Sequence, residues 1–451
     1  MASKYKKGGN FMLLRFKTSN FKAFKNEVEF VMSPAKVDEF SYSILEKNYG
    51  DKSSKALCTS IIYGPNAAGK TTIINAMSCF KNIILRGNIL DDDKHSDDVV
   101  SNNMQLIPFA FNEKNEPVMF ELEFIFNEHK YKYHLEMDLG QFGVSYNDRK
   151  ILNEELCVDD YLIFKRTNND IEVEHLTKIS ELLLDGFDKN LAKKNLEISK
   201  SNLDPKILFL TTDFDSIISK KINSNIKLWL NEYFVVVNKS NIKSLRPVYN
   251  LNEDSIYIEK NINDIARESG IIGTDFAYHH TKENKTELVS LIGAKNKERF
   301  ALPSELVESQ GTIRLIGIIP YIFNVFKNGG TLVIDELDAS LHPMIIMNIL
   351  NIFHNDEINK NKAQIIFNTH NPIYLDNQLV RRDEIKFVEK DKDTKASVLY
   401  ALSDFKTTGP TGVRNTTDYM KNYFINRFGA IENVDLSDIF LNILEEGNKN
   451  V

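Results

Sequence analysis

Short apolar runs separated by helix-compatible stretches recur along this chain. Residues 60–63, 331–334 and 364–367 are each mostly apolar, which is typical of strands buried on both faces of a parallel sheet. The stretch 73–85, directly after the first of these runs, is compatible with a helix. This order of elements predicts an α/β fold built on a parallel sheet.

A change of period marks a second kind of layer. Residues 120–126 and 130–136 alternate between apolar and polar positions on the two sides of Asn127 and Glu128. Alternation with a period of two across a short turn is the pattern of a β-hairpin. An antiparallel layer is therefore expected beside the parallel sheet.

The middle of the chain, 151–302, gives mixed signals. Residues 176–191 and 213–233 have the apolar spacing of helices, whereas 249–267 is too polar to assign. No heptad pattern is sustained, so long coiled-coil arms are not expected. We therefore predict a compact, mainly helical insert that acts as a lid or in oligomerisation. The insert contains lysines that could contact nucleic acid, but a solvated helical face is the favoured interpretation. These lysines are Lys220, Lys221, Lys227 and Lys243.

A glycine-rich loop lies between the strand 60–63 and the helix 73–85. It fits the pattern Gly-x-x-x-x-Gly-Lys-Ser/Thr, in which backbone N–H groups and the positive end of the next helix bind phosphates. Lys70 can reach the β- and γ-phosphates, and the Thr71 hydroxyl can bind Mg²⁺. The expected nucleotide-binding residues are Gly64, Pro65, Asn66, Ala67, Ala68, Gly69, Lys70, Thr71 and Thr72.

Two carboxylates follow the strand 331–334. Asp335 and Glu336 come where a parallel sheet presents side chains to a nucleotide at its carboxyl edge. We expect Asp335 to hold Mg²⁺ and Glu336 to polarise the attacking water, because phosphoryl transfer depends on positioning and charge neutralisation. Adjacent acids at a strand end can also be a surface accident, an interpretation that the glycine-rich loop argues against.

A histidine follows the third apolar run. His370 comes after Asn368 and Thr369 and is therefore expected near the same sheet edge. A lone histidine is usually structural. In this setting we predict that His370 contacts the γ-phosphate and senses whether ATP is intact.

A serine and a glycine open another predicted helix. Ser309 and Gly311 precede the apolar stretch 313–326, which Gly329 and Gly330 end. The start of such a helix can bind an anion. An ordinary helix cap is the competing interpretation of the same residues.

In this order, the motifs resemble those of ABC-type ATPases, above all the soluble branch with SMC proteins, RecF and the overcoming-lysogenisation-defect (OLD) ATPases of phage defence. Three strings resemble the OLD branch: the opening at 12–24, the Asp-Glu segment at 331–343 and the histidine segment at 367–372. The resemblance covers 12–137 and 300–430. It implies a P-loop ABC-type ATPase head with an antiparallel β layer and an inserted, mainly helical subdomain.

The resemblance also implies a site shared between two chains. In that group the nucleotide is sandwiched between protomers, so Ser309 and Gly311 would serve the ATP held by the partner. One copy of each element per chain requires at least a dimer, or dimers within a larger ring. Asp338 would lie at the seam between protomers, although a helix-start cap explains it equally well. Gln105 is the candidate for the glutamine that the family places near the γ-phosphate and metal.

Composition sets the frame for these motifs. The chain has 451 residues, 42% of them hydrophobic, which suffices for a large α/β domain plus an inserted subdomain. With a net charge of −7, any nucleic-acid contact must come from a local patch. The three cysteines form no Cys-x-x-Cys pair, which suggests a reducing compartment and excludes a zinc hook. The sequence indicates neither a membrane span nor a signal peptide, so we expect a cytoplasmic protein.

We expect four segments along the chain. These are a flexible extension at 1–11, an ATPase lobe with the glycine-rich loop and β layer at 12–150, the insert at 151–302, and a second ATPase lobe with the remaining motifs at 303–451. The acidic stretch 91–98 is interpreted as a solvated loop rather than a metal site.

One string near the C-terminus resembles a nuclease element. Residues 385–391 are similar to the glutamate strand of a Toprim nuclease, in which that glutamate and later paired aspartates hold metal ions. No later strand ends in Asp-x-Asp. Glu389 is therefore better interpreted as part of another strand of the ATPase sheet, continued by a hairpin strand at 397–402, and we predict no nuclease in this chain.

The expected function is an ATPase that uses ATP and Mg²⁺ and closes as a dimer around the nucleotide. The resemblance implies a regulatory subunit of a bacterial anti-phage defence system that controls a separate nuclease or toxin, with at most weak nucleic-acid contact. The alternative is a DNA-binding clamp of the RecF or SMC type. The ATPase subunit of a membrane transporter is disfavoured, because 308–312 departs from Leu-Ser-Gly-Gly-Gln and the insert is large.

Overall fold

The structure is a computed structural model. The predictions for residues 1–10, the acidic stretch 91–98 and Lys243 lie outside the described residues. The described residues are 11–36, 40–90, 105–142, 149–168, 170–238, 255–258, 260–280, 286–293, 299–407, 412–414, 416–432, 435–437, 439–441 and 443.

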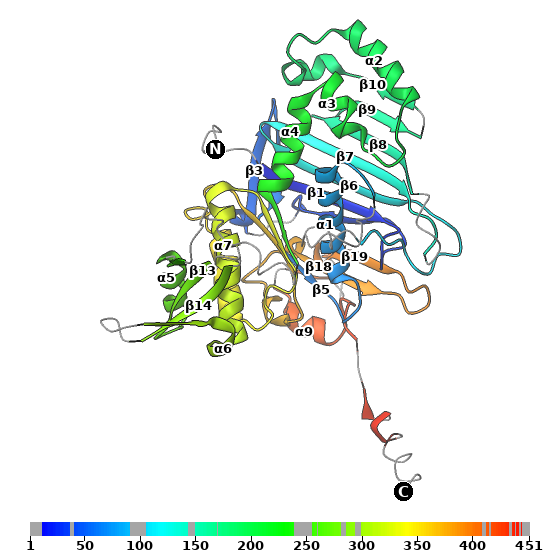
Figure 1. The fold of residues 1–451 in the computed structure, drawn as a ribbon. Coiled ribbons are helices and arrows are strands. Elements are labelled where there is room, and N and C mark those ends of the chain that lie inside the picture. The colour runs from blue at the N-terminus through cyan, green and yellow to red at the C-terminus, as the bar shows by residue number, and fades with distance from the viewer. Residues whose placement is uncertain are drawn as a thin grey trace.

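A six-stranded sheet forms the centre of the molecule (Figure 1). Its first five strands are parallel, and the last pairs antiparallel to its neighbour. The three apolar runs are thus strands of one parallel sheet, and 385–391 is another strand of it, as predicted. In spatial order the strands are β11 (Phe234–Val237), β16 (Thr331–Ile334), β17 (Gln364–Asn368), β5 (Thr59–Tyr63), β18 (Ile385–Lys390) and β19 (Ser397–Ala401).

Both faces of this sheet are buried, which explains its nearly continuous apolar sequence. Successive residues of a strand point to opposite faces. Accordingly, Ile62 and Ile366 belong to one hydrophobic core, whereas Ile61 and Ile365 belong to another. The helices that cover the two faces are α1 (Lys70–Arg86) on the first, and α7 (Gln310–Asn328) and α8 (Pro343–His354) on the second.

A seven-stranded antiparallel sheet forms the second layer. The predicted hairpin is its centre, and Asn127 and Glu128 turn the chain with φ angles of 49° and 69°. Positive φ at both positions is the requirement of the tight turn whose twist matches the strands. In spatial order the strands are β10 (Asp170–Val173), β9 (Tyr161–Thr167), β8 (Lys150–Val158), β7 (His129–Asp138), β6 (Val118–Phe126), β1 (Phe11–Ser19) and β2 (Val28–Val31).

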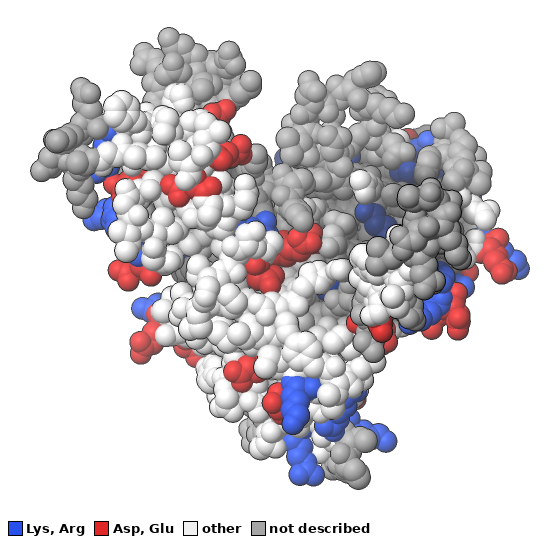
Figure 2. Space-filling model, turned by 90° about the horizontal axis from the view of Figure 1, so that it is seen from below, with Lys and Arg blue, Asp and Glu red and all other residues white. Residues whose placement is uncertain are grey.

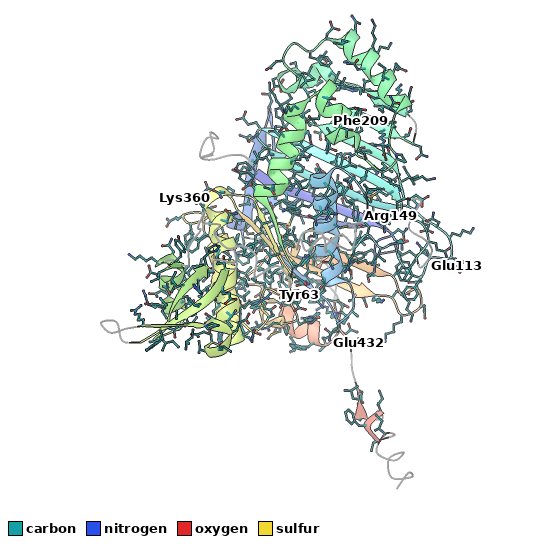
Figure 3. All side chains as sticks on the ribbon, in the orientation of Figure 1. Tyr63, Glu113, Arg149, Phe209, Lys360 and Glu432 are labelled. Atoms are coloured by element: carbon teal, nitrogen blue, oxygen red, sulfur yellow. The ribbon has the colours of Figure 1, made fainter. Side chains whose placement is uncertain are left out.

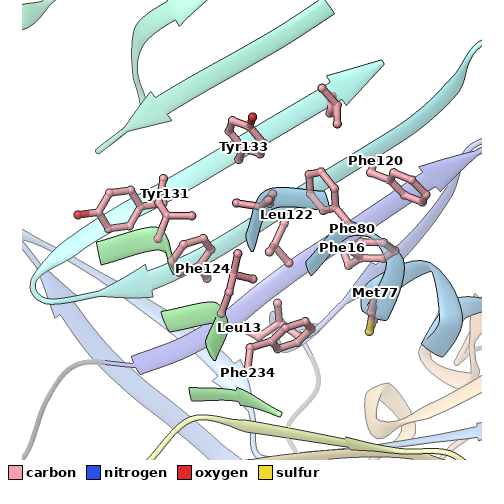
Figure 4. Close-up of a cluster of buried hydrophobic side chains, with 14 of the residues drawn as sticks. Leu13, Phe16, Met77, Phe80, Phe120, Leu122, Phe124, Tyr131, Tyr133 and Phe234 are labelled. Atoms are coloured by element: carbon pink, nitrogen blue, oxygen red, sulfur yellow. The ribbon is translucent and has the colours of Figure 1, made fainter. Parts of the chain in front are cut away.

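Aromatic packing fixes helix α1 between the two sheets (Figure 4). The Phe80 ring stacks on Phe120 of β6 at 5.4 Å and on Tyr133 of β7 at 5.9 Å between ring centroids. Met77, one turn earlier, is buried in the same core. Because α1 is held in this way, the loop that precedes it has a fixed place at the end of β5.

The antiparallel layer corrects two of the expected segment boundaries. Strands β8, β9 and β10 extend the layer beyond residue 150, so the sheet does not end where the insert was expected to begin. Phe11 is the first residue of β1 and not part of an extension. Whether the segments are independent folding units stays a prediction.

The segment 151–302 is less helical than predicted. Helices dominate 176–233, which packs against the antiparallel sheet. Phe209 lies in this upper lobe, whereas Tyr63 lies in the middle of the molecule (Figure 3). The later part carries a four-stranded sheet. The helical elements are η4 (Leu176–Leu182), α2 (Lys189–Ser201), η5 (Phe209–Thr211), α3 (Asp213–Ile217), α4 (Lys220–Leu228), η6 (Trp229–Tyr233) and α5 (Lys260–Glu268), and the strands are β12 (Ser255–Tyr257), β13 (Asp275–His280), β14 (Thr286–Ile292) and β15 (Phe300–Pro303).

Short elements complete the described chain. The remaining strands and helices are η1 (Ser41–Ser43), β3 (Ile44–Tyr49), β4 (Lys52–Leu57), α6 (Ser304–Val307), η7 (Pro372–Tyr374), η8 (Arg382–Glu384), η9 (Leu402–Asp404) and α9 (Tyr419–Phe424).

Candidate nucleotide site

Three neighbouring strands deliver the predicted residues to one edge of the central sheet. Strands β16, β17 and β5 lie side by side and run parallel, so their carboxyl ends meet. Asp335 and Glu336 follow β16, His370 follows β17, and the glycine-rich loop 64–69 follows β5. The structure therefore brings the loop, the carboxylates and the histidine to the carboxyl edge, where α/β sheets bind their ligands.

The glycine-rich loop depends on close backbone packing. A Cβ on Gly64 would lie 2.2 Å from the carbonyl oxygen of Val388 in the neighbouring strand, so a side chain cannot be accommodated there. Gly69 caps α1 with a φ of 110°, a conformation that favours glycine. These two constraints explain the glycines at the two ends of the loop, and they leave the N-terminus of α1 at the sheet edge.

Lys70 is folded back onto the loop. Its Nζ donates hydrogen bonds to the carbonyl oxygens of Gly64, at 2.7 Å, and Pro65, at 2.9 Å. Burial lowers the pKa of Lys70 to about 8, against the opposing effect of Glu336 and Asp335. The ammonium is thus partly desolvated, a state in which an anionic ligand gains the most from it.

Thr71, Asp335 and Asn368 form a compact oxygen-rich cluster. The Thr71 hydroxyl donates to Asp335 Oδ1 at 2.9 Å, and the Asn368 amide donates to the same oxygen at 2.6 Å. Adjacent ligands of an octahedral Mg²⁺ with bonds of about 2.1 Å are about 3.0 Å apart, which matches the Thr71–Asp335 oxygen pair. The pair therefore fits a magnesium ion, and its role as a metal site stays a prediction.

Glu336 has a strained backbone that two residues support. Its φ is 50°, which is unfavourable for a residue with a Cβ. The Glu336 N–H donates to Asn368 Oδ1, and Arg314 Nη2 donates to the carbonyl oxygens of Asp335, at 3.0 Å, and Glu336. Neither Asn368 nor Arg314 was predicted as a site residue. The available signals were a polar residue at the end of an apolar strand and a single charge within the apolar helix 313–326.

His370 lies close to Lys70. Its Nδ1 is 3.5 Å from Lys70 Nζ, and the ring is exposed at the sheet edge. Burial, followed by the Lys70 ammonium, lowers the pKa of His370. The imidazole is therefore neutral at pH 7 and can donate or accept a hydrogen bond at this edge.

Asp338 is not a helix-start cap. Its Oδ2 accepts a 2.6 Å hydrogen bond from the Thr369 hydroxyl, and burial raises the pKa of its carboxyl group. The next helix, α8, begins at Pro343 and is capped by His342 instead. Asp338 is thus tied to the end of β17, and its place at a seam between protomers stays a prediction.

Ser309 does cap a helix. Its Oγ accepts the N–H of Thr312 at 3.1 Å at the start of α7, so the cap interpretation holds within one chain. Gly311 packs closely, because a Cβ there would lie 2.3 Å from the carbonyl oxygen of Ser340. Ser309 itself is exposed. Among the described residues, the side chain of Ser309 forms hydrogen bonds with Thr312 and none with the glycine-rich loop. The role of Ser309 and Gly311 in binding a partner's nucleotide stays a prediction.

Gln105 lies outside the cluster of Thr71, Asp335 and Asn368. Its Oε1 accepts a 3.1 Å hydrogen bond from Lys22 Nζ. Ala23, which follows Lys22 in the sequence, lies against the glycine-rich loop, because a Cβ built on Gly69 would be 3.3 Å from the Ala23 Cβ. Gln105 is therefore linked to the neighbourhood of the loop through Lys22, and its role near the γ-phosphate and metal stays a prediction.

The described helices include none with the length and apolar character that a membrane span requires.

The geometry of the site agrees with what comparison of the chain with known families shows. Residues 60–376 match the family described as "AAA domain, putative AbiEii toxin, Type IV TA system". The matched region spans the glycine-rich loop, the Asp-Glu pair and His370. The chain belongs to this family of AAA-domain proteins and has the mixed α/β fold of AAA/ABC-type ATPases.

Solved structures of low similarity include two heads of SMC proteins. The SMC head domain from Thermotoga maritima is 13% identical, with a TM-score of 0.38, covering 86% of this chain and 98% of that one. An Smc head with an extended coiled coil, bound to the C-terminal domain of ScpA and derived from Pyrococcus furiosus, is 13% identical, with a TM-score of 0.39, covering 87% of this chain and 96% of that one. No curated protein matches the chain.

Proposed function

We propose that this protein hydrolyses ATP at the carboxyl edge of its central sheet. The observation that carries the proposal is the cluster in which Thr71 and Asn368 converge on one oxygen of Asp335, beside the buried Lys70. Hydroxyl, carboxylate and ammonium groups at the end of a glycine-rich loop are the groups that bind a triphosphate and its metal.

Each residue has a distinct part in the proposed reaction. Lys70 exchanges its bonds to the loop carbonyls for bonds to phosphate oxygens. Thr71 and Asp335 hold Mg²⁺, which when bound neutralises charge on the phosphates. Glu336 orients and polarises the attacking water, and its strained backbone is kept in place by Asn368 and Arg314. His370, neutral at pH 7, contacts the γ-phosphate.

We further propose that two chains complete the site. Ser309 is exposed at the start of α7, which is 19 residues long, so its first turn can present N–H groups and a positive helix end to an anion on another molecule. Each chain then contributes its loop to one site and Ser309 and Gly311 to the other. ATP would close the dimer, and hydrolysis would open it.

At the level of the cell, the proposed role is regulation of a separate nuclease or toxin in bacterial anti-phage defence. The family description, which mentions a type IV TA system, supports a partnered role. Glu389 accepts a hydrogen bond from Tyr400 of the paired strand β19 and lies within the ATPase sheet, which supports a structural role for this residue rather than a nuclease role.

A DNA-binding clamp is the second candidate. The fold of an ATPase head is compatible with it, but the chain carries a net charge of −7. On the face shown in Figure 2, basic and acidic side chains are interspersed, and the basic ones do not form one continuous surface. Duplex DNA binding depends strongly on such a surface, so we favour the regulatory role.

Co-purification from the native host distinguishes the two roles. A tagged chain with Glu336→Gln, which should hold the closed state, is isolated with Mg²⁺-ATP, and bound protein and DNA are identified; Lys70→Ala serves as the matched control. The proposal predicts that a nuclease or toxin protein co-purifies with the Glu336→Gln chain. The Lys70→Ala chain should lose this protein or bind a different amount of it. Duplex DNA retained at about 150 mM salt, without such a protein, would support the clamp instead.

A further inference from the structure

A second cluster of reactive side chains lies at the opposite edge of the central sheet from the nucleotide site. Cys58 directly precedes β5, Glu384 directly precedes β18, and His354 is the last residue of α8. These positions are at the amino ends of the parallel strands, whereas the glycine-rich loop follows their carboxyl ends. Residues far apart in the sequence are thus gathered away from the proposed reaction.

The three side chains of this cluster are almost completely buried, and their ligand atoms lie close together. Cys58 and Glu384 have no exposed surface, and His354 is 6% exposed. One ligand atom from each lies within 4.8 Å of the other two, and His354 Nε2 is 3.0 Å from Glu384 Oε1. The Thr59 hydroxyl borders the same space, 2.7 Å from Glu384 Oε1 and 3.3 Å from His354 Nε2.

We propose that Cys58, His354 and Glu384 bind one zinc ion. Sulfur, imidazole nitrogen and carboxylate oxygen are the donors that zinc prefers in proteins, and a tetrahedral ion would take one further ligand beside these three. Zinc with bonds of about 2.0–2.3 Å holds its ligand atoms about 3.3–3.8 Å apart. The longest separation in the cluster, up to 4.8 Å, therefore needs to shorten by about 1 Å around the ion, whereas the Nε2–Oε1 pair at 3.0 Å opens slightly. Small rotations of the side chains provide both movements.

Charge balance is compatible with zinc in this buried place. A thiolate and a carboxylate together carry the charge that balances one Zn²⁺, so the filled site is neutral in a fully buried place. On binding, the zinc–sulfur bond replaces the sulfur–hydrogen bond of Cys58, and the proton leaves to solvent.

The surroundings help to orient the three side chains. Glu384 Oε2 accepts the N–H of Arg381 at 2.8 Å, which fixes the carboxylate while its other oxygen faces His354. The Tyr42 ring packs edge-on against the His354 ring at 5.8 Å between centroids and is 42% exposed. Supporting groups of this kind orient metal ligands.

Bound zinc would connect parts of the fold that no disulfide connects. The ion would tie the end of α8 to the starts of β5 and β18, in a chain whose three cysteines are free. Binding to the folded state alone raises stability. The site is therefore structural, and it is independent of the proposed hydrolysis of ATP.

Cobalt titration tests the proposal directly. The untagged, chelator-treated chain is titrated with Co²⁺ without nucleotide, and the near-ultraviolet sulfur-to-cobalt charge-transfer band is recorded with the bound metal content. We expect the band and one zinc-displaceable ion per chain. Cys58→Ser should lose the band, and Glu384→Gln should weaken affinity at least about tenfold. Cys157→Ser, which removes a thiol outside the cluster, is the matched control and should keep the band.

The outcomes separate a metal site from a hydrogen-bonded cluster. Co²⁺ bound at Thr71 and Asp335 would give no charge-transfer band, because that site has no sulfur. Zinc should also raise the thermal midpoint of the wild-type chain and of Cys157→Ser. Absence of the band in the wild-type chain, or its persistence in Cys58→Ser, would overturn the proposal. The wild-type measurement decides the question even if Cys58→Ser does not fold.

Discussion

The candidate nucleotide site has two parts that differ in how fully one chain builds them. The strand-end part, with Lys70, Thr71, Asp335 and Asn368, is joined by hydrogen bonds within the chain and is largely buried. The helix-start part is Ser309 and its neighbours at the start of α7, where Ser309 is exposed. The first part is organised before a ligand arrives, whereas the second presents its groups outward.

This difference teaches where each function can reside. A preorganised cluster is suited to binding phosphate and metal, since little reorganisation is needed. An exposed helix start can act only on something brought to it. Arg314 joins the two parts, because it lies in the second turn of α7 and donates to the carbonyl oxygens of Asp335 and Glu336. If a partner chain moves α7, as proposed, that movement would reach Glu336, the residue proposed to position water.

The largest expected effect comes from the strand-end part. Glu336→Gln should lower kcat about 10²-fold or more while ATP affinity changes little, because the water is no longer polarised but the metal ligand Asp335 remains. Steady-state hydrolysis and equilibrium nucleotide binding measure the two quantities. Glu357→Gln, at an exposed position, is the control. A parental rate in Glu336→Gln would show that this residue does not act on water.

Arg314 tests the link between the two parts. Arg314→Gln should lower kcat about 10-fold to 100-fold with a smaller change in KM, because the carbonyl oxygens of Asp335 and Glu336 lose their donor and the water-polarising group shifts. Arg314→Lys, which keeps the charge but not the fork of donors, should recover part of the rate. Equal losses in kcat and ATP affinity would indicate general disruption of the fold instead.

The smallest expected effect is on the pH dependence of nucleotide binding. The pKa of Lys70 is about 8 in the ligand-free chain, below its ordinary value. Phosphate favours the charged ammonium, so nucleotide affinity is highest well below pH 8 and falls as pH rises through 8, because Lys70 of the ligand-free protein then loses its proton. We expect about a tenfold loss between pH 7 and pH 9. Lys70→Arg, charged throughout, should remove this dependence, and calorimetric titration at both pH values will show whether it does.

The strand-end part was largely predictable from the sequence, because local pattern fixes it. An apolar strand, a glycine-rich loop and a helix determine where Lys70 and Thr71 lie, and parallel pairing brings Asp335 to them. Asn368 and Arg314 escaped notice because their roles arise only from tertiary contacts. Asp338 was compatible with a cap from sequence alone, but the fold gives it Thr369 as a partner.

The insert was harder to predict for a physical reason. Strands β12 to β15 are three to seven residues long, too short for a clear period, and their pairing rather than their composition defines them. The helices at 213–233 were predictable because a sustained apolar face packs onto the antiparallel layer, with the Trp229 ring stacked on Phe124 at 3.9 Å between centroids. Long periodic elements are thus readable, and short paired ones are not.

The most direct test of the shared site mixes two inactive chains. One carries Lys70→Ala, which disables the strand-end part, and the other carries Ser309→Arg, which blocks the helix-start part. Ser309 is preferred to Gly311, where any side chain would meet the Ser340 carbonyl oxygen within its own chain. Ser309→Asn, which can still cap α7, is the control for folding and should hydrolyse ATP.

The measured quantity is the ATP hydrolysis rate of an equal mixture. If each site is built from the loop of one chain and the helix start of another, half of the dimers are mixed and each has one intact site. The mixture should then recover about one quarter of the wild-type rate, although each variant alone is inactive. A mixture that stays as inactive as its components would contradict the account, because it would place the whole site within a single chain.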